Sequence, residues 1–120
     1  MIIETETKIR LITEASEAMK AADLLILDLR GVSTFTDFFV LATVASRTQL
    51  RAILREIRRR LKEAGDIPVR CDGEDSDHWA VMDLGDIVIH VFDAETRVRY
   101  SLERLWGDAR LVDTADFLTA

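Results

Sequence analysis

The chain has 120 residues, of which 48% are hydrophobic and 32% are charged, and its formal net charge at pH 7 is −6. This length and composition predict one globular domain with its own core, and the acidic balance argues against a protein whose whole surface binds nucleic acid. No apolar run approaches the roughly 20 residues needed to cross a bilayer, and no export signal is visible. The single cysteine, Cys71, fits a reducing compartment, so we expect a cytoplasmic protein.

The first part of the chain has the patterns of a helix and two strands. Apolar residues at helical spacing predict an amphipathic helix over residues 4–22. Alternation then predicts a strand over residues 24–30, followed by a loop at 31–36 that is rich in turn-forming residues. Residues 37–44 are almost continuously apolar, which is typical of a strand covered on both faces. We therefore expect this second strand in the centre of a sheet.

The most regular pattern in the chain is a second amphipathic helix, which begins after the N-cap residue Ser46. Gly65 stands where the glycine after a helix end is expected, and Pro68 follows it. One side of this helix is apolar and carries Leu50, Ile53, Leu54, Ile57, Leu61 and Ala64. That side should pack on the core.

Arginines repeat every four residues along another side of the same helix, at Arg47, Arg51, Arg55 and Arg59. Such a stripe could contact the phosphates of RNA. It lacks interleaved aromatic residues, so readout of bases is not expected. The alternative is a solvated helix face balanced by acidic neighbours, which is what most charge runs are.

A β-hairpin organises the second half of the chain. It follows a short predicted strand at residues 69–72 and an acidic loop at 73–77. Its turn is Leu84-Gly85-Asp86, where glycine supplies the positive φ that a tight hairpin needs. A turn centred on Gly85-Asp86 predicts that Asp83 pairs with Val88, Val81 with His90 and Trp79 with Phe92.

Period-2 alternation gives this hairpin two faces. One is wholly apolar and carries Ala80, Met82, Leu84, Ile87, Ile89 and Val91; the other carries Trp79, Val81, Asp83, Val88, His90 and Phe92. A pure core face has no use for an acid and an imidazole, so the second face is the predicted working surface. We predict a binding role for Trp79, a residue type common in binding hot spots, and a core position for Phe92 and Tyr100.

The remaining segment predicts a turn or short helix after Asp93, and Gly107 ends a compact apolar stretch. The predicted fold class is therefore α/β, with a mixed sheet of about five strands flanked by helices. We expect one domain over residues 1–109 and a C-terminal tail over residues 110–120.

Two enzyme classes are alternatives to a binding role. Asp28, Asp37, Asp83 and Asp86 stand near predicted strand ends, where a metal-dependent nucleotidyltransferase would place its carboxylates. That class pairs a Gly-Ser phosphate loop with an Asp-x-Asp, and the sequence has neither, so turn capping is favoured for these residues.

Nucleophilic or zinc chemistry is the second alternative. Cys71 and His90 could form a nucleophile–base pair, but a lone strand cysteine is more often a small buried hydrophobe. His78 and His90 are too few for a zinc site. We therefore predict no catalytic residue, no metal and no cofactor.

Three stretches carry motifs that resemble one family in order and spacing. The first is Asp28-Leu29-Arg30 with Ser33, Thr36-Asp37, Phe39-Val40-Leu41-Ala42-Thr43, Ser46 and Gln49. The second is Gly73-Glu74 with Ser76, Trp79, Asp83-Leu84-Gly85-Asp86, His90 and Val91, and the third is Arg97 and Tyr100 with Leu102-Glu103-Arg104-Leu105-Trp106. Together they span about residues 9–109, and they resemble the ribosome silencing factor family, also called Iojap-like.

The resemblance implies a translation repressor that is not an enzyme, with a fold related to nucleotidyltransferases in which the catalytic motif is absent. Members of the family bind the large ribosomal subunit through its ribosomal protein fourteen. They block joining of the small subunit when nutrients are limiting. They are often homodimers, and the resemblance implies that the ribosome could compete with that self-association.

Carried over by motif position, the ribosomal-protein contact should centre on Trp79, Asp83 and Leu84, with Met82 and Asp86 as neighbours. Contact with ribosomal RNA would be peripheral and confined to the arginine stripe. Two departures from the family pattern stand out. Val44-Ala45 replaces a usual Gly-Thr or Gly-Asn, and His78 stands where a small or acidic residue is frequent.

Overall fold

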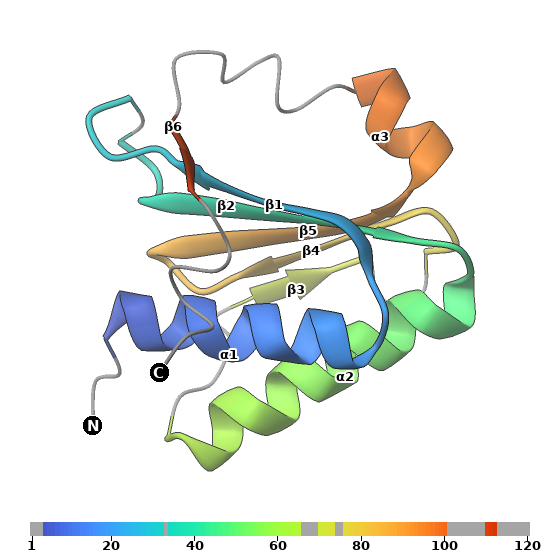
Figure 1. Ribbon diagram of the computed structural model, residues 1–120, viewed down its shortest axis with the longest axis horizontal. Coiled ribbons are helices and arrows are strands. Elements are labelled where there is room, and N and C mark those ends of the chain that lie inside the picture. Colours follow the sequence, from blue (N-terminus) through green and yellow to red (C-terminus); the bar gives the residue numbers. More distant parts are fainter. Residues whose placement is uncertain (1–3, 33, 66–69, 74–75, 101–109, 113–120) are drawn as a thin grey trace.

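A computed structural model describes residues 4–32, 34–65, 70–73, 76–100 and 110–112. Its helices are α1 (Thr5–Ala18), α2 (Arg47–Glu63) and α3 (Ala94–Tyr100). Its strands are β1 (Ala22–Asp28), β2 (Phe38–Val44), β3 (Arg70–Asp72), β4 (Trp79–Asp83), β5 (Ile87–Asp93) and β6 (Arg110–Val112). The strands form one mixed sheet in the order β3-β4-β5-β2-β1-β6, with α1 and α2 on one face and α3 beyond the other (Figure 1). The predicted α/β class is confirmed.

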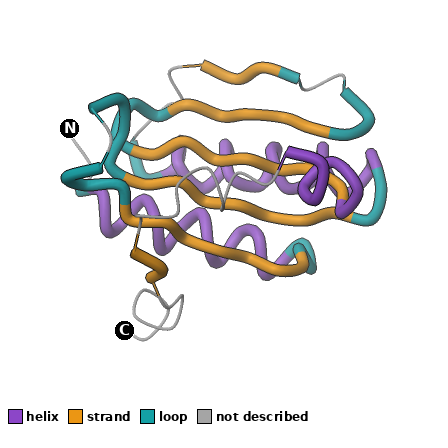
Figure 2. The backbone as a smooth tube through the Cα atoms, turned by 90° about the horizontal axis from the view of Figure 1, so that it is seen from above, coloured by secondary structure: helices purple, strands orange, loops and turns teal. Residues whose placement is uncertain are grey.

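The centre of the sheet is the parallel pair β2 and β5, and the other neighbouring strands run antiparallel. Figure 2 shows the strands side by side, with α1 and α2 crossing beneath them. Val40, Leu41 and Ala42 of β2 are completely buried, although successive side chains point to opposite faces. The prediction that residues 37–44 form a central strand covered on both sides is therefore confirmed.

The helix predicted after Ser46 is α2, and its ends are held as expected. The Ser46 hydroxyl accepts a hydrogen bond of 3.1 Å from the Gln49 backbone N–H, and Gly65 has a φ of +96°. The side-chain amide of Gln49 donates to the backbone carbonyls of Met19 and Lys20, at 3.0 and 2.9 Å. The end of α1 is thereby tied to the start of α2.

The first difference from the predicted boundaries concerns the end of α1 and the position of β1. Helix α1 ends at Ala18 rather than near Ala22, because Lys20, just beyond it, adopts a positive φ of 63°. Strand β1 covers residues 22–28 instead of 24–30, and Asp23, with a φ of 47°, lies inside it at an irregularity in its pairing with β2. The second difference is β6, which pairs antiparallel with β1 in the segment predicted as a tail. The division at residue 109 stays a prediction.

The sheet separates two clusters of buried apolar side chains. The larger lies between the sheet and helices α1 and α2. The smaller lies on the opposite face and contains Leu27, Leu29, Leu41 and Phe92, with Phe39 and Trp79 packed against them. We call this second face the open face, because α1 and α2 do not cover it (Figure 1).

Candidate functional site

The hairpin formed by β4 and β5 has the predicted register. Trp79 pairs with Phe92, Val81 with His90 and Asp83 with Val88. Gly85 has a φ of +90° in the turn, as expected. This register sends Trp79, Val81 and Asp83 to one face of β4, and the structure leaves all three partly exposed.

The base of the hairpin fixes the position of Trp79. The Ser76 hydroxyl accepts hydrogen bonds from the backbone N–H groups of His78 and Trp79, at 3.1 and 3.2 Å. Gly73, with a φ of +84°, passes so close that a Cβ there would lie 2.5 Å from the Trp79 carbonyl oxygen. The acidic loop therefore needs glycine at this position, and it holds the start of β4 in place.

The aromatic cluster of the open face surrounds Trp79. Its members are Phe39, Trp79, His90, Phe92 and Tyr100. The Trp79 ring centroid lies 4.7 Å from that of Tyr100 and 5.9 Å from those of His90 and Phe92. Phe92 is completely buried, as predicted, but the predicted core position of Tyr100 is wrong, because its side chain is 49% exposed. Tyr100 is the last residue of α3 and covers Trp79 from the rim.

His90 is the polar member of the aromatic cluster. The Trp79 indole N–H donates to its Nδ1 at 3.2 Å, and the side chain is only 7% exposed. Burial lowers the pKa of His90 to about 4, so the imidazole is neutral at physiological pH. Its Nε2 is buried and has no hydrogen-bond partner in the part of the chain that the structure describes.

A nucleophilic pair of Cys71 and His90 is not formed. Cys71 lies in β3 and packs against the helix-side cluster, whereas His90 lies on the open face. Burial also raises the pKa of the Cys71 thiol, which disfavours the reactive thiolate. The two side chains therefore lie on opposite sides of the sheet.

The structure divides the five residues predicted to contact the ribosomal protein. Met82 is completely buried and Leu84 is 6% exposed, both in the core under α1 and α2. Neither side chain offers surface to a partner. Trp79 and Asp83 lie on the opposite side of β4 and are partly exposed.

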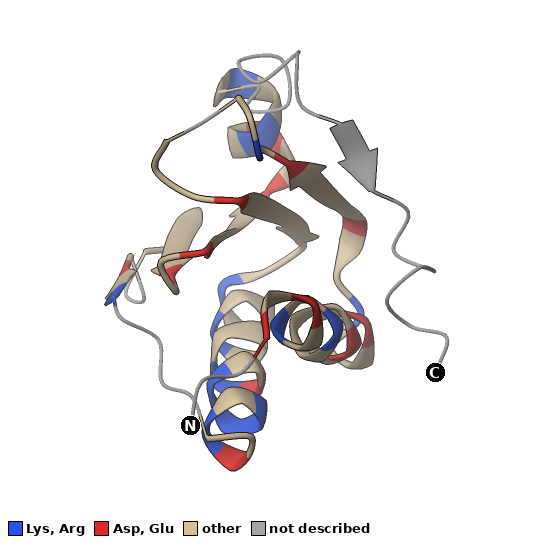
Figure 3. Ribbon diagram, turned by 90° about the vertical axis from the view of Figure 1, so that its left-hand side faces the viewer, with Lys and Arg blue, Asp and Glu red and all other residues tan. Residues whose placement is uncertain are grey.

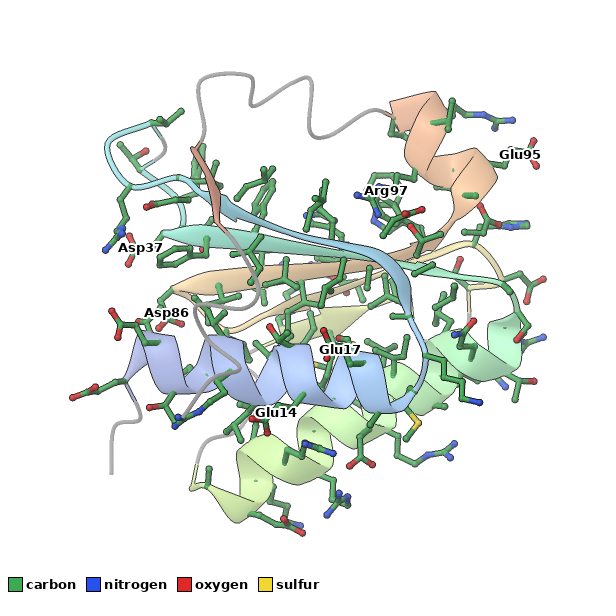
Figure 4. All side chains as sticks on the ribbon, viewed as in Figure 1. Glu14, Glu17, Asp37, Asp86, Glu95 and Arg97 are labelled. Carbon is green, nitrogen blue, oxygen red and sulfur yellow. The ribbon has the colours of Figure 1, made fainter. Side chains whose placement is uncertain are left out.

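The fifth residue, Asp86, is held by the first turn of α1. Its carboxylate accepts a hydrogen bond of 2.5 Å from the Thr5 hydroxyl and lies 3.3 Å from the Lys8 ammonium. Figure 4 shows Asp86 directly beside the start of this helix. Asp83 has a local role as well, because its carboxylate accepts the Gly85 backbone N–H at 2.7 Å.

The strand-end aspartates gather at one end of the sheet, as antiparallel and parallel pairing dictates. Figure 4 shows Asp37 and Asp86 near each other there. The Asp28 carboxylate forms an ion pair of 2.8 Å with Arg30. The Asp83 carboxylate accepts a hydrogen bond within the hairpin turn, and the Asp86 carboxylate accepts one from α1. Among the described residues, no group of three His, Cys, Asp or Glu side chains could hold a metal ion. Hydrogen bonds and ion pairs within the chain thus account for three of these four carboxylates.

The arginine stripe lies on α2, where Figure 3 shows a concentration of basic residues. Arg47 forms an ion pair of 3.1 Å with Asp77, and Arg59 pairs with both Glu56 and Glu63. Arg55 is exposed. These pairs support the predicted alternative of a balanced helix face, and they place Arg47 beside the hairpin base.

Two contacts around α3 were not predicted from the sequence. His78 Nδ1 lies 2.6 Å from an Asp93 carboxylate oxygen, which raises the pKa of His78, and hydrogen bonds from Thr96 lower the pKa of Asp93 to about 2. Extending the hairpin register by one pair beyond Trp79 and Phe92 would have found this contact.

The second missed residue is Arg97, which is 8% exposed. Its guanidinium donates to the Asp23 carbonyl at 2.6 Å and to the Thr43 hydroxyl at 2.7 Å, and it lies over the Phe92 ring. In Figure 4 it points from α3 back toward the sheet. Arg97 therefore anchors α3.

Comparison with known proteins gives consistent matches along the chain. The family model described as "ribosomal silencing factor during starvation" matches residues 3–120. The ribosomal silencing factor of Bacillus subtilis is 39% identical over 105 residues, which are 88% of this chain and 89% of that protein. A crystal structure of a protein from Chromobacterium violaceum has a TM-score of 0.84 at 33% identity, covering 88% of each chain.

A mouse protein named for mitochondrial assembly of the ribosomal large subunit is a more distant relative. It is 34% identical over 89 residues, which are 72% of this chain and 39% of that protein. Within the described residues, no helix is both long enough and apolar enough to span a membrane.

Proposed function

We propose, from the premise that the chain belongs to the family of ribosomal silencing factors during starvation, that it acts by occluding the large ribosomal subunit. In this proposal the chain binds ribosomal protein fourteen of that subunit and blocks joining of the small subunit. Membership of the family makes the chain a ribosome-associated regulator of translation and not an enzyme. The cytoplasmic location expected from the sequence is part of the proposal.

The observation that carries the proposal is a strip of partly exposed side chains on the open face of the hairpin. We call this strip, which consists of Trp79, Val81, Asp83 and Val88, the hairpin surface. It combines an aromatic anchor, two aliphatic side chains and a carboxylate. An apolar centre with a charged rim is the composition of a protein–protein contact, and a carboxylate suits a basic partner.

The hairpin surface is narrower than the contact predicted from the family motif. Met82 and Leu84 are left out because their side chains fill the core, and Asp86 is left out because α1 holds it. The choice of the large subunit is supported by the name of the mouse relative, which assigns that protein to assembly of the large subunit.

Two secondary contacts complete the proposal. The arginine stripe, Arg47, Arg51, Arg55 and Arg59, would touch ribosomal RNA only at the periphery, since acidic residues already pair with Arg47 and Arg59. Away from the ribosome, we propose that the chain forms a homodimer. The RNA contact follows from the spacing of the arginines in an otherwise acidic chain, and the homodimer follows from the family resemblance.

Co-sedimentation with purified large subunits tests the proposal. We expect the chain to sediment with large subunits and to reduce 70S formation when small subunits are added afterwards. Trp79→Ala should fold and bind about 30-fold more weakly, since loss of a hot-spot tryptophan costs about 2 kcal/mol. Phe35→Ala is the matched control, because Phe35 is an aromatic side chain that is 85% exposed and lies outside the hairpin. Full binding by a folded Trp79→Ala variant would contradict the proposed surface.

A further inference from the structure

His90 is a buried polar side chain that a partner could not contact directly. It lies in β5 between β2 and β4, and its ring centroid is 4.8 Å from that of Phe39 and 6.3 Å from that of Phe92. Only 7% of the residue is exposed, so the ring is enclosed by aromatic neighbours. A hydrophobic side chain would fill this position without the cost of burying a polar group.

The hydrogen bond from Trp79 defines the state of this imidazole. An indole N–H can only donate, so His90 Nδ1, which lies 3.2 Å away, must be the unprotonated acceptor. The proton of the neutral ring is then on Nε2, which has no oxygen or nitrogen partner within the described chain. The hydrogen bond to Trp79 is therefore the polar interaction that offsets the burial of His90.

The aromatic cluster restricts Trp79 but does not by itself choose its orientation. Tyr100 and Phe92 contact the indole in tilted arrangements, with interplanar angles of 46° and 40°, and aromatic pairs are favourable over a range of such arrangements. A hydrogen bond is directional, so it selects one orientation of the ring. It also occupies the only polar group that the indole could present to a partner.

We propose that His90 is a positioning residue for ribosome binding, which holds the Trp79 indole in its binding orientation and makes its contact with the partner purely apolar. This inference rests on the function proposed above and assigns a role to a residue behind the hairpin surface. An anchor that is already ordered loses less side-chain entropy on binding than a mobile one. The partner needs an apolar pocket for this indole and no hydrogen-bond acceptor.

Two variants with side chains of similar shape distinguish the effect of the hydrogen-bond acceptor from the effect of packing. His90→Asn places a carbonyl oxygen where Nδ1 lies, and His90→Leu has the same branching without any acceptor. Leucine suits a buried site better than asparagine, so a purely structural role predicts that His90→Leu binds large subunits more tightly than His90→Asn. A positioning role predicts that His90→Asn binds them more tightly than His90→Leu. Ile89→Val, next to His90 on β5 but packed in the helix-side cluster and outside the hairpin surface, is the control.

The first readout is the indole N–H signal of Trp79 in a 1H–15N NMR spectrum, identified by its absence in Trp79→Phe. We expect its exchange with solvent to be about tenfold faster in His90→Leu than in the wild type, as expected for loss of one hydrogen bond. His90→Asn should restore protection in part, and Ile89→Val should leave the signal unchanged.

The second readout is affinity for purified large subunits. We expect His90→Leu to bind about tenfold more weakly than the wild type and His90→Asn to bind more tightly than His90→Leu. Wild-type affinity in His90→Leu, with the indole N–H released, would overturn positioning and leave the proposed function intact. Failure of the wild type itself to bind would overturn both, and would do so before any variant is compared.

Discussion

The two faces of the hairpin are made from alternate residues of the same strands, yet they perform different tasks. On the helix side, Ala80, Met82 and Ile89 have no exposed surface and serve the core. On the open side, Trp79 and Asp83 remain partly exposed beside a buried imidazole. A sequence motif runs along the strand and counts residues of both faces, whereas a partner meets only one face. The comparison teaches that neighbours in a motif need not share a surface.

Removing the Met82 side chain should show the contrast between the two faces most strongly, as a loss of folding stability. Met82→Ala leaves a cavity between the sheet and the helices, and we expect it to reduce the free energy of unfolding by about 3 kcal/mol. Urea denaturation would measure this loss. Val81→Ala, one residue away on the partly exposed face, should cost about 1 kcal/mol or less. The reverse ranking would mean that the core lies on the open side.

Lowering the pH should destabilise the fold through the buried His90 imidazole of the open face. The folded-state pKa of His90, about 4, is below the unfolded value of 6.5, so the unfolded chain takes up this proton first. The contribution of His90 is complete above pH 6.5 and declines as the pH falls toward 4. The two pKa values differ by about 2.5, which corresponds to roughly 3 kcal/mol at the lower pH.

The acid effect is measured as a difference between chains, because carboxylates also titrate in this range. Thermal melts of the wild type and His90→Leu at pH 7, 5.5 and 4 would isolate it. We expect His90→Leu to lose less stability than the wild type as the pH is lowered. Parallel pH profiles for the two chains would exclude a buried neutral histidine.

At the hairpin tip, Asp86 should matter for folding more than Asp83. Asp86→Asn removes the negative charge beside Lys8, whose side chain is only 10% exposed, and we expect a loss of about 1.5 kcal/mol in urea denaturation. Asp83→Asn keeps an oxygen that can accept the Gly85 N–H, so its stability should stay within about 0.5 kcal/mol of the wild type. Equal losses in the two variants would mean that α1 does not hold Asp86.

At the hairpin base, the smallest expected effect has the opposite sign to that of His90. The Asp93 carboxylate raises the pKa of His78 above its unfolded value of 6.5, with Asp77 and Glu95 adding to the shift. The His78 contribution is therefore complete below pH 6.5 and is lost as the pH rises through the raised pKa. Thermal melts between pH 6 and 9 should show a slight decline that is absent in His78→Gln.

Local patterns predicted the parts of the molecule that are governed locally. The cap of α2 at Ser46, the turn at Gly85 and the register of the hairpin depend on residues close in sequence, and all three are confirmed. Alternation also placed Met82 and Leu84 on the apolar face before the motif comparison named them as contacts. The burial of both side chains confirms that assignment to the apolar face.

Features that depend on distant segments were not predicted from the sequence. Strand β6 has only three residues, and its place is decided by the free edge of β1 rather than by its own pattern. The exposure of Tyr100 depends on where α3 ends above the sheet. Arg97 contacts residues from β1 and β2, 74 and 54 positions earlier in the chain, so spacing gave no signal for its anchoring role.

The parallel pair at the centre of the sheet has a consequence for how the chain folds during synthesis. Phe38 of β2 pairs with Ile87 of β5, so the middle of the sheet closes a long loop of chain that includes α2. Residues emerge from the ribosome in order, and β2 waits there for a strand made much later. The nascent chain can pair one edge of β2 with β1, but the other edge of this highly apolar strand stays open until β5 has been made.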